Sequence, residues 1–408
     1  MDALGLIRSS ELALRDVYSH YEEIAYDNQA RVLKAFQNHT VRESYFAPSS
    51  GYGYGDQGRD ELESIYAEVM GTEEAMVRGQ IVSGTHAISA CLAALLQPGQ
   101  QMLAVAGTPY DTLTRVIGSI EPAPGTLVAR GVKYGEVSLD SNGRPDHRAI
   151  AAQVNAGTRL ALIQRSRGYS LRPALRVEDI AEMVGVIRAA NPATIIFVDN
   201  CYGEFTDIQE PSAVGADLMA GSLIKNPGGG LAPSGGYIAG HRELVATVAD
   251  HLTAPGLGKA LGASLANKRS LYQGLFMAPH TVLQAMKGSV LLAHTFRELG
   301  YKVFPGPDQP RGDIVQAVRL GSAEQVIRFC QIVQNSSPVD SDVHLEYGEV
   351  PGYADRIVMA AGTFVQGSSI EISCDAPLRE PYVAYWQGGL SYEHCRLTIK
   401  NLVESFSK

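Results

Sequence analysis

The strongest constraint on the fold is a regular alternation of short apolar segments with helical segments from about residue 61 onward. The short segments have the apolar composition of buried strands and cover residues 74–79, 100–107, 159–164 and 193–200. The helical segments around them cover residues 60–71, 83–96 and 177–191. Such alternation is typical of a mostly parallel sheet with helices on both faces, so we predict an α/β fold.

The pattern divides the 408-residue chain into three parts. Residues 1–60 begin with amphipathic helical segments and end in a loop rich in Gly, Ser and Tyr. Residues 61–279 carry the alternating pattern of the large domain. Residues 280–408 open with a long helical segment and continue with shorter strands and helices. We therefore predict a large domain with a mostly parallel sheet and a smaller C-terminal α+β domain.

Composition excludes several functional classes. The formal net charge is −9, which gives no electrostatic footprint for nucleic acid or for an anionic membrane. Five scattered cysteines without a CxxC pair argue against a disulfide framework and a metal site, and they suit a reducing cytoplasm. No segment has the uninterrupted apolar length of a membrane helix, and the N-terminus lacks a signal-peptide pattern.

A lysine within GSLIKNPGGG is the first candidate for chemistry. Lys225 follows a short apolar strand, Ser222 lies three positions earlier, and glycines follow it. A lysine in this setting can form an imine with an aldehyde cofactor and later carry a proton, while the serine hydroxyl can bind a phosphate. The alternative is an ordinary surface lysine before a turn.

An aspartate in FVDNCYGEF strengthens the first interpretation. Asp199 ends a buried apolar strand, where an ionised carboxylate is costly unless it is paired. A protonated pyridine nitrogen would pair with it, although an aspartate there can also cap the next helix. Asp199 precedes Lys225 by 26 residues, and this order and spacing are typical of a pyridoxal 5'-phosphate site.

Two further motifs suit the same cofactor. VSGTHAISA places Ser83, Gly84 and Thr85 at the start of a helix, where free N–H groups and the helix dipole favour a phosphate. Tyr110 follows a predicted strand and could stack on a cofactor ring. The alternatives are a plain capped helix and a core tyrosine.

These motifs together resemble the cystathionine/methionine γ-lyase branch of pyridoxal-phosphate enzymes, and more closely the methionine γ-lyase-like or aluminium-resistance proteins. The segments GYGYGDQGRDELE, SGTHAI, QRSRGYSLRP, FVDNCYGEF, GSLIKNPGGG and YWQGGL carry the resemblance over most of the chain. The resemblance implies the fold-type I transferase fold, a Schiff base between Lys225 and the cofactor, and a carbon–sulfur lyase activity on an amino acid.

The resemblance also implies roles for individual residues. Lys225 would be the general base, Asp199 would pair with the pyridine nitrogen, and Tyr110 would stack on the ring and protonate a departing thiol. The phosphate would be bound by Ser83, Gly84, Thr85 and Ser222, and from a neighbouring subunit by Tyr52 or Tyr54 with Arg59. This implies a homodimer at least, and a homotetramer is favoured. Arg379 would bind the substrate carboxylate, unless it is only a solvated loop arginine.

The chain departs from that branch at several positions. Ile224 replaces a usual hydroxyl residue before the lysine, and Arg165 and Arg167 lie where the branch has a different sequence. Three hypotheses therefore follow from the sequence. They are a carbon–sulfur lyase, another pyridoxal-phosphate reaction such as transamination, and a catalytically silent protein that acts by binding.

Overall fold

The computed structural model describes residues 2–348, 353 and 355–407. Its large domain is built on a seven-stranded sheet in the order β1-β7-β6-β5-β4-β2-β3. Neighbouring strands pair in parallel from β3 to β6, while β7 pairs antiparallel with both β6 and β1. The strands are β1 (Glu74–Arg78), β2 (Gln101–Ala104), β3 (Lys133–Glu136), β4 (Thr158–Gln164), β5 (Ile195–Asp199), β6 (Leu218–Ser222) and β7 (Gly236–Gly240). The predicted α/β class and the mostly parallel sheet are confirmed.

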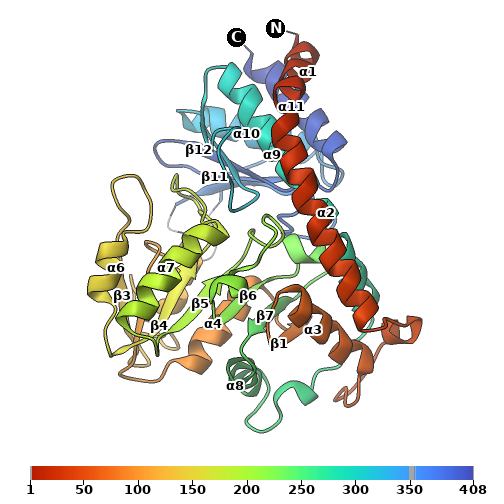
Figure 1. The fold of residues 1–408 in the computed structure, drawn as a ribbon. Coiled ribbons are helices and arrows are strands. Elements are labelled where there is room, and N and C mark those ends of the chain that lie inside the picture. Colours follow the sequence, from red (N-terminus) through yellow and green to blue (C-terminus); the bar gives the residue numbers. More distant parts are fainter. Residues whose placement is uncertain (1, 349–352, 354, 408) are drawn as a thin grey trace.

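The central strands are buried along their whole length because helices cover both faces of the sheet (Figure 1). The helices of this domain are α3 (Gln57–Val69), α4 (Gly84–Leu95), α5 (Asp111–Ile117), α6 (His147–Gln153), α7 (Val177–Ala190) and α8 (Arg242–Leu252). Short 3₁₀ turns are η1 (Glu43–Phe46), η2 (Pro211–Val214), η3 (Asn226–Gly228) and η4 (Gly258–Ala260). Parallel strands with crossover helices place their carboxyl ends at one edge of the sheet, which is where polar side chains of such folds meet.

The smaller domain has a five-stranded antiparallel sheet in the order β10-β11-β12-β9-β8. Its strands are β8 (Lys302–Phe304), β9 (Gln316–Arg319), β10 (Ile357–Ala360), β11 (Ser373–Pro377) and β12 (Val383–Gln387). Its helices are α10 (Ala323–Asn335) and α11 (Tyr392–Phe406). The predicted α+β character of this part of the chain is therefore confirmed.

Two long helices join the domains. The N-terminal segment forms α1 (Ala3–Ala13) and α2 (Arg15–Asn38), and α2 runs from the small domain at the top of Figure 1 to the large domain below. Helix α9 (Lys268–Glu298) packs along α2 and contains Pro279 in its interior. Our predicted boundary at residues 279 and 280 falls inside this helix, because proline is a common but not obligatory end of a helix.

The cysteines and the length of the apolar helices complete the description of the fold. All five cysteines are buried and free. None of the helices in the described residues is long and apolar enough to cross a membrane.

Candidate active site

A cavity of about 580 Å³ lies at the carboxyl ends of β2, β4, β5 and β6, within the size range of sites for small ligands. Its walls include most of the residues that the sequence analysis selected. These are Ser83, Gly84, Thr85, Tyr110, Asp199, Ser222, Lys225 and Arg379. They come from positions nearly 300 residues apart in the chain, so the fold brings them together.

Lys225 follows β6 and is partly buried in this cavity. Its Nζ lies 3.8 Å from the centre of the Tyr202 ring, in a cation–π contact. The glycines after it serve the backbone: a Cβ on Gly228 would lie 1.7 Å from the carbonyl oxygen of Leu223, and one on Gly229 would lie 2.3 Å from that of Gly274 in α9. Only glycine permits this close approach, which fixes the segment that carries the lysine.

Asp199 ends β5 and is only 3% exposed. Its Oδ1 accepts a hydrogen bond from the backbone N–H of Cys201 at 3.2 Å. Burial raises the pKa of the Asp199 carboxyl, and the nearby charge of Lys225 opposes the rise. A cationic group of a ligand bound in the cavity would stabilise the charged form of this buried carboxylate.

The first turn of α4 forms a cradle for an anion. The Oγ atom of Ser83 accepts the N–H of His86 at 3.0 Å, and His86 Nδ1 accepts the N–H of Val82 at 3.2 Å, so His86 belongs to the cap. The N–H groups of Gly84 and Thr85 have no acceptor in the described part of the chain. A Cβ on Gly84 would meet Ser222 at 3.1 Å, so only glycine leaves this space open.

Tyr110 lies where the sequence placed it, between β2 and α5. Its hydroxyl shares a hydrogen bond with Thr85 Oγ1 at 3.1 Å, and its backbone N–H donates to Gln164 Oε1 at 2.8 Å. Burial raises the pKa of the Tyr110 phenol, and the charge of Asp199 raises it further. The phenol therefore keeps its proton and can act as a donor.

These features fit pyridoxal phosphate. Orphaned N–H groups at the N-terminus of α4 suit its phosphate, the buried Asp199 suits its pyridine nitrogen, and Lys225 suits its aldehyde. Among the described residues, no group of three His, Cys, Asp or Glu side chains could hold a metal ion.

The sequence analysis missed several residues of the cavity wall. Tyr202 has a left-handed backbone (φ 69°), and it was overlooked although its motif had been singled out. Tyr169 donates its hydroxyl to Asp375 at 3.0 Å, and burial raises the pKa of Asp375 to about 6. The periodicity of the sequence gives no signal for such contacts, because 206 residues separate these two partners.

Arg167 and Arg172 were noticed in the sequence only as a departure or not at all. Both line the cavity, and burial lowers the pKa of each guanidinium, that of Arg172 to about 10. Arg172 donates Nη1 to the Pro173 carbonyl at 3.0 Å and Nη2 to the Gln164 carbonyl at 2.9 Å. It therefore holds the end of β4 in place.

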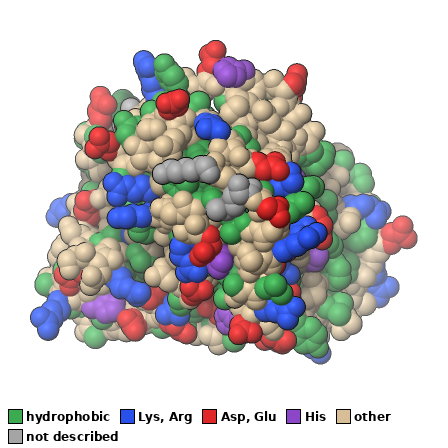
Figure 2. Space-filling model, turned by 90° about the horizontal axis from the view of Figure 1, so that it is seen from above, with side chains coloured by type: hydrophobic (Ala, Val, Ile, Leu, Met, Phe, Trp, Pro, Cys, Tyr) green, Lys and Arg blue, Asp and Glu red, His purple; other side chains and the backbone are tan. Residues whose placement is uncertain are grey.

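Arg379 lies at the rim of the cavity and is 45% exposed. Its Nη1 donates to Asp355 Oδ2 at 2.6 Å, and its Nη2 donates to the Tyr169 carbonyl at 3.3 Å. Among the described residues of the cavity wall, the cations are Arg167, Arg172, Lys225 and Arg379, and the acids are Asp111 and Asp199. This cationic excess favours anionic ligands, whereas on the outer face in Figure 2 acidic and basic side chains are interspersed.

The predicted phosphate partners from the N-terminal loop do not line this cavity in the single chain. Tyr52 and Tyr54 are 73% and 63% exposed, and their ring centres lie 5.6 Å apart. Arg59 is buried, and its Nη1 donates to the carbonyls of Gly53 at 2.8 Å and Gly262 at 3.0 Å. Arg59 thus anchors the loop that displays the two tyrosines.

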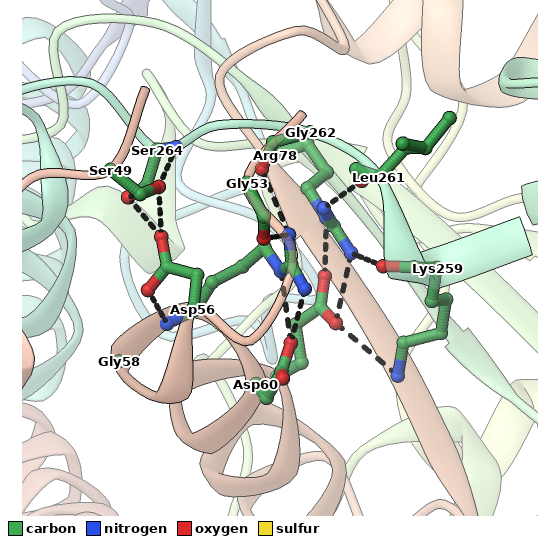
Figure 3. Close-up of polar contacts among 12 residues, drawn as sticks. Ser49, Gly53, Asp56, Gly58, Asp60, Arg78, Lys259, Leu261, Gly262 and Ser264 are labelled. Carbon is green, nitrogen blue, oxygen red and sulfur yellow. Dashed lines mark hydrogen bonds and ion pairs between the residues drawn. The ribbon is translucent and has the colours of Figure 1, made fainter. Parts of the chain in front are cut away.

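A network of ion pairs surrounds this loop (Figure 3). Asp56 caps α3 and binds Lys268, Ser49 and Ser264. Arg78 binds Glu63 through Nε at 2.6 Å and donates Nη1 to the Leu261 carbonyl at 2.7 Å. In Figure 3 the Asp56 group and the Arg78 group lie on either side of Gly53, next to the start of α3.

Comparison with known proteins places the chain among close relatives. A model of the family described as methionine gamma-lyase matches residues 3–407. The uncharacterized protein YnbB of Bacillus subtilis (strain 168) is 47% identical over 397 residues, which are 97% of this chain and 94% of the relative.

Solved structures agree. A structure from Listeria monocytogenes has a TM-score of 0.96 at 46% identity and covers 98% of this chain and 99% of that chain. A carbon-sulfur lyase involved in aluminum resistance from Clostridium novyi NT has a TM-score of 0.95 at 44% identity and covers 99% and 96%. The pyridoxal-5'-phosphate dependent protein YhfS of Escherichia coli, with a TM-score of 0.60 at 22% identity over 93% of this chain and 96% of that chain, shows the fold alone. The predicted fold-type I class is confirmed.

Proposed function

Because the chain belongs to the methionine gamma-lyase family, we propose that it is a pyridoxal-phosphate-dependent carbon–sulfur lyase acting on a sulfur-containing amino acid. The predicted resemblance is thereby confirmed. One observation carries the proposal: Lys225, Asp199 and the cradle at Ser83 to Thr85 line one cavity with a cationic excess. We also propose that it works in the cytoplasm, as five free cysteines suggest.

The cofactor would be held at both ends of the cavity. The N–H groups of Gly84 and Thr85 and the hydroxyl of Ser222 would bind its phosphate, and Lys225 would bind its aldehyde carbon. When bound, pyridoxal phosphate supplies an electron-accepting ring that stabilises negative charge on the α-carbon of an amino acid. Asp199 would hold a proton on the ring nitrogen and so increase this effect.

The protein's own groups would then move the protons. Lys225 Nζ would remove the α-proton of the substrate, and the Tyr110 hydroxyl would protonate the sulfur that leaves. The cationic wall of the cavity would bind the substrate carboxylate. Elimination at the β- or γ-carbon with uptake of water would release a thiol, a keto acid and ammonia.

We propose that the active unit is at least a homodimer. Tyr52 and Tyr54 present two neighbouring exposed aromatic rings, and their hydroxyls make no hydrogen bond within the described residues. They share this part of the surface with Leu265, which is 60% exposed and donates its backbone N–H to the Ser49 carbonyl of the same loop. Contact with the phosphate cradle of a second chain would explain both features, and light scattering at micromolar concentration would measure the mass of the particle.

The first experiment tests cofactor and base together. The purified protein, incubated with pyridoxal phosphate, should absorb in the near-visible range, and borohydride reduction should fix the label on Lys225. A protein that stays colourless, or a label on another lysine, would overturn the proposal.

The second experiment tests the reaction. Cystathionine, cysteine conjugates and methionine should each be offered to the loaded protein, with assays for thiol and keto acid. We expect both products in equal amounts from at least one substrate. Keto-acid-dependent amino exchange without thiol would instead indicate transamination, and no product from any of them would indicate a protein that acts by binding.

A further inference from the structure

We infer that Arg167, and not the exposed Arg379, binds the α-carboxylate of the substrate and so selects amino acids over amines. The inference rests on the proposed function, because it names the residue that recognises one part of that substrate. Arg167 belongs to the segment QRSRGYSLRP, and the proposed mechanism gives no role to any residue of that segment.

The guanidinium of Arg167 is buried with unused donors. The residue lines the Lys225 cavity and is only 3% exposed. Its Nη1 donates to the Phe304 carbonyl at 2.8 Å, but its buried Nε has no hydrogen-bond partner among the described residues. Within the described part of the chain its Nη2 makes no hydrogen bond either. The Nε–Nη2 edge is the one that binds a carboxylate with two parallel hydrogen bonds.

The nearest acid does not satisfy this edge. Asp313 Oδ2 lies 3.8 Å from Arg167 Nε, which is too long for a hydrogen bond. The same oxygen already accepts from Ser166 Oγ at 3.1 Å and from the Arg167 backbone N–H at 3.2 Å. Asp313 Oδ1 accepts from the Val315 N–H at 3.1 Å. Asp313 thus fixes the backbone and leaves the guanidinium edge for another anion.

A second buried cation adds to the local positive charge. Arg311 is 6% exposed, and no described residue forms a hydrogen bond with its Nε or Nη1. Burial lowers the pKa of the Arg311 guanidinium, the charge of Arg167 lowers it further, and the charge of Asp313 opposes this. The guanidinium groups of Arg167, Arg172 and Arg311 therefore all interact with the single acid Asp313, and a carboxylate at Arg167 would offset part of the excess positive charge.

The backbone holds Arg167 rigidly for this task. Ser170 Oγ donates to the Arg167 carbonyl at 2.8 Å, and Asp313 accepts the Arg167 N–H. Arg379, in contrast, is 45% exposed and is already paired with Asp355. A ligand without a carboxylate would leave the buried donors of Arg167 unpaired, which costs binding free energy. The same ligand would cost much less at Arg379, because water can bind an exposed donor.

The test compares L-alanine with ethylamine, which is alanine without its carboxylate. Neither ligand has a leaving thiol, so binding is separated from elimination. Half-saturating concentrations are measured from the change in the near-visible band of the cofactor-loaded full chain. We expect the wild type to prefer alanine by about 100-fold or more, and we expect Arg167→Gln to reduce the preference to a few-fold.

The matched control is Arg379→Gln, which should keep the preference within about threefold because exposed ion pairs contribute little. Arg167→Lys keeps the charge without the fork and should fall between Arg167→Gln and the wild type. The inference would be overturned if only Arg379→Gln lost the preference for alanine over ethylamine. It would also be overturned if both glutamine variants kept that preference. If the lyase assay fails but Arg167→Gln still loses the preference for alanine and Arg379→Gln keeps it, only the proposed reaction is overturned.

A second readout uses neither turnover nor cofactor. Sodium propionate, compared with sodium chloride at equal ionic strength, should raise the melting temperature of the cofactor-free wild type but not that of Arg167→Gln. Equal shifts in both proteins, or no shift in the wild type, would count against Arg167. The melting temperatures without propionate show whether each variant folds.

Discussion

Two buried clusters of charge in this molecule are built in opposite ways. Around the N-terminal loop, Asp56 is bound by Lys268, Ser49 and Ser264, and Arg78 is bound by Glu63 and two backbone carbonyls. In the cavity at the carboxyl ends of the strands, Lys225 faces the ring of Tyr202, and the described residues leave one donor edge of Arg167 unused. The first cluster is closed within the chain, and the second is open.

The difference separates a structural role from a binding role. A buried charge is costly, and in the closed cluster protein partners offset that cost. In the open cluster the described residues leave the pairing of Arg167 incomplete. Incomplete pairing is tolerated where a ligand completes it, so we assign the closed cluster to holding the loop and the open cluster to chemistry.

The largest effect should come from the open cluster. Lys225→Ala removes the group that we propose as both cofactor anchor and base, so activity should fall by at least about a thousand-fold. The near-visible band of the loaded protein should be lost, while the melting temperature of the cofactor-free protein stays close to that of the wild type. Lys225→Arg is the control, because it keeps a charge but cannot bind the aldehyde. An active Lys225→Ala protein would remove the central premise.

In the closed cluster, Lys268→Met should act on stability. The change leaves Asp56 buried without its cation and should cost about 3 to 5 kcal/mol in the free energy of unfolding. Burial works to raise the pKa of Asp56, but Lys268, Ser264 and Ser49 hold it below its ordinary range. The stabilisation is therefore present above about pH 4 and is lost as the pH falls further.

Denaturant titrations at pH 7 and pH 3 measure this effect. The gap between wild type and Lys268→Met should narrow at pH 3. Lys400→Met, which removes an exposed helical pair with Glu404, should cost less than about 0.5 kcal/mol. Equal costs for the two variants would show that the cluster is not the closed network that its contacts indicate.

Glu204 provides an intermediate test, because it is fully buried near Lys225 and its Oε2 has no hydrogen-bond partner in the described part of the chain. Burial raises the pKa of Glu204 to about 8, above its value in the unfolded chain. The folded protein thus binds more protons, and this group lowers stability as the pH rises towards 8. We expect wild type to lose about 2 kcal/mol relative to Glu204→Gln between pH 6 and pH 8.

The matched control is Glu210→Gln. Glu210 is equally buried, but it faces Arg165 and Arg31 and accepts from Asn200 at 3.0 Å. Its replacement should destabilise the cofactor-free protein at both pH values, as expected for a closed pair. A pH-independent difference between wild type and Glu204→Gln would contradict the protonated state of Glu204.

The sequence predicted the parts of the site that depend on local patterns. Asp199 ends a strand, Lys225 and Ser83 each follow one, and parallel strands end at one edge of the sheet, so the proximity of these residues could be inferred. Arg167 could not be assigned, because its state depends on Asp313, 146 residues away. The start of α9 at Lys268 was missed for a similar reason, since Gly274 and Ala278 pack against η3 and keep Pro279 within one helix.

The smallest effect should come from replacing Tyr52 or Tyr54. Both tyrosines are exposed to solvent on the loop that the closed cluster holds. If one of these hydroxyls reaches the phosphate in a second chain, its replacement by Phe should weaken cofactor binding by about tenfold, the value of one hydrogen bond to a charged group. Stability should change by less than about 0.5 kcal/mol, because both rings are exposed. Dissociation constants for pyridoxal phosphate would show which single variant is affected. They should be measured at protein concentrations above the dissociation constant of the dimer. If neither Tyr52→Phe nor Tyr54→Phe weakens binding, the loop belongs wholly to the closed region, and the phosphate is held by one chain alone.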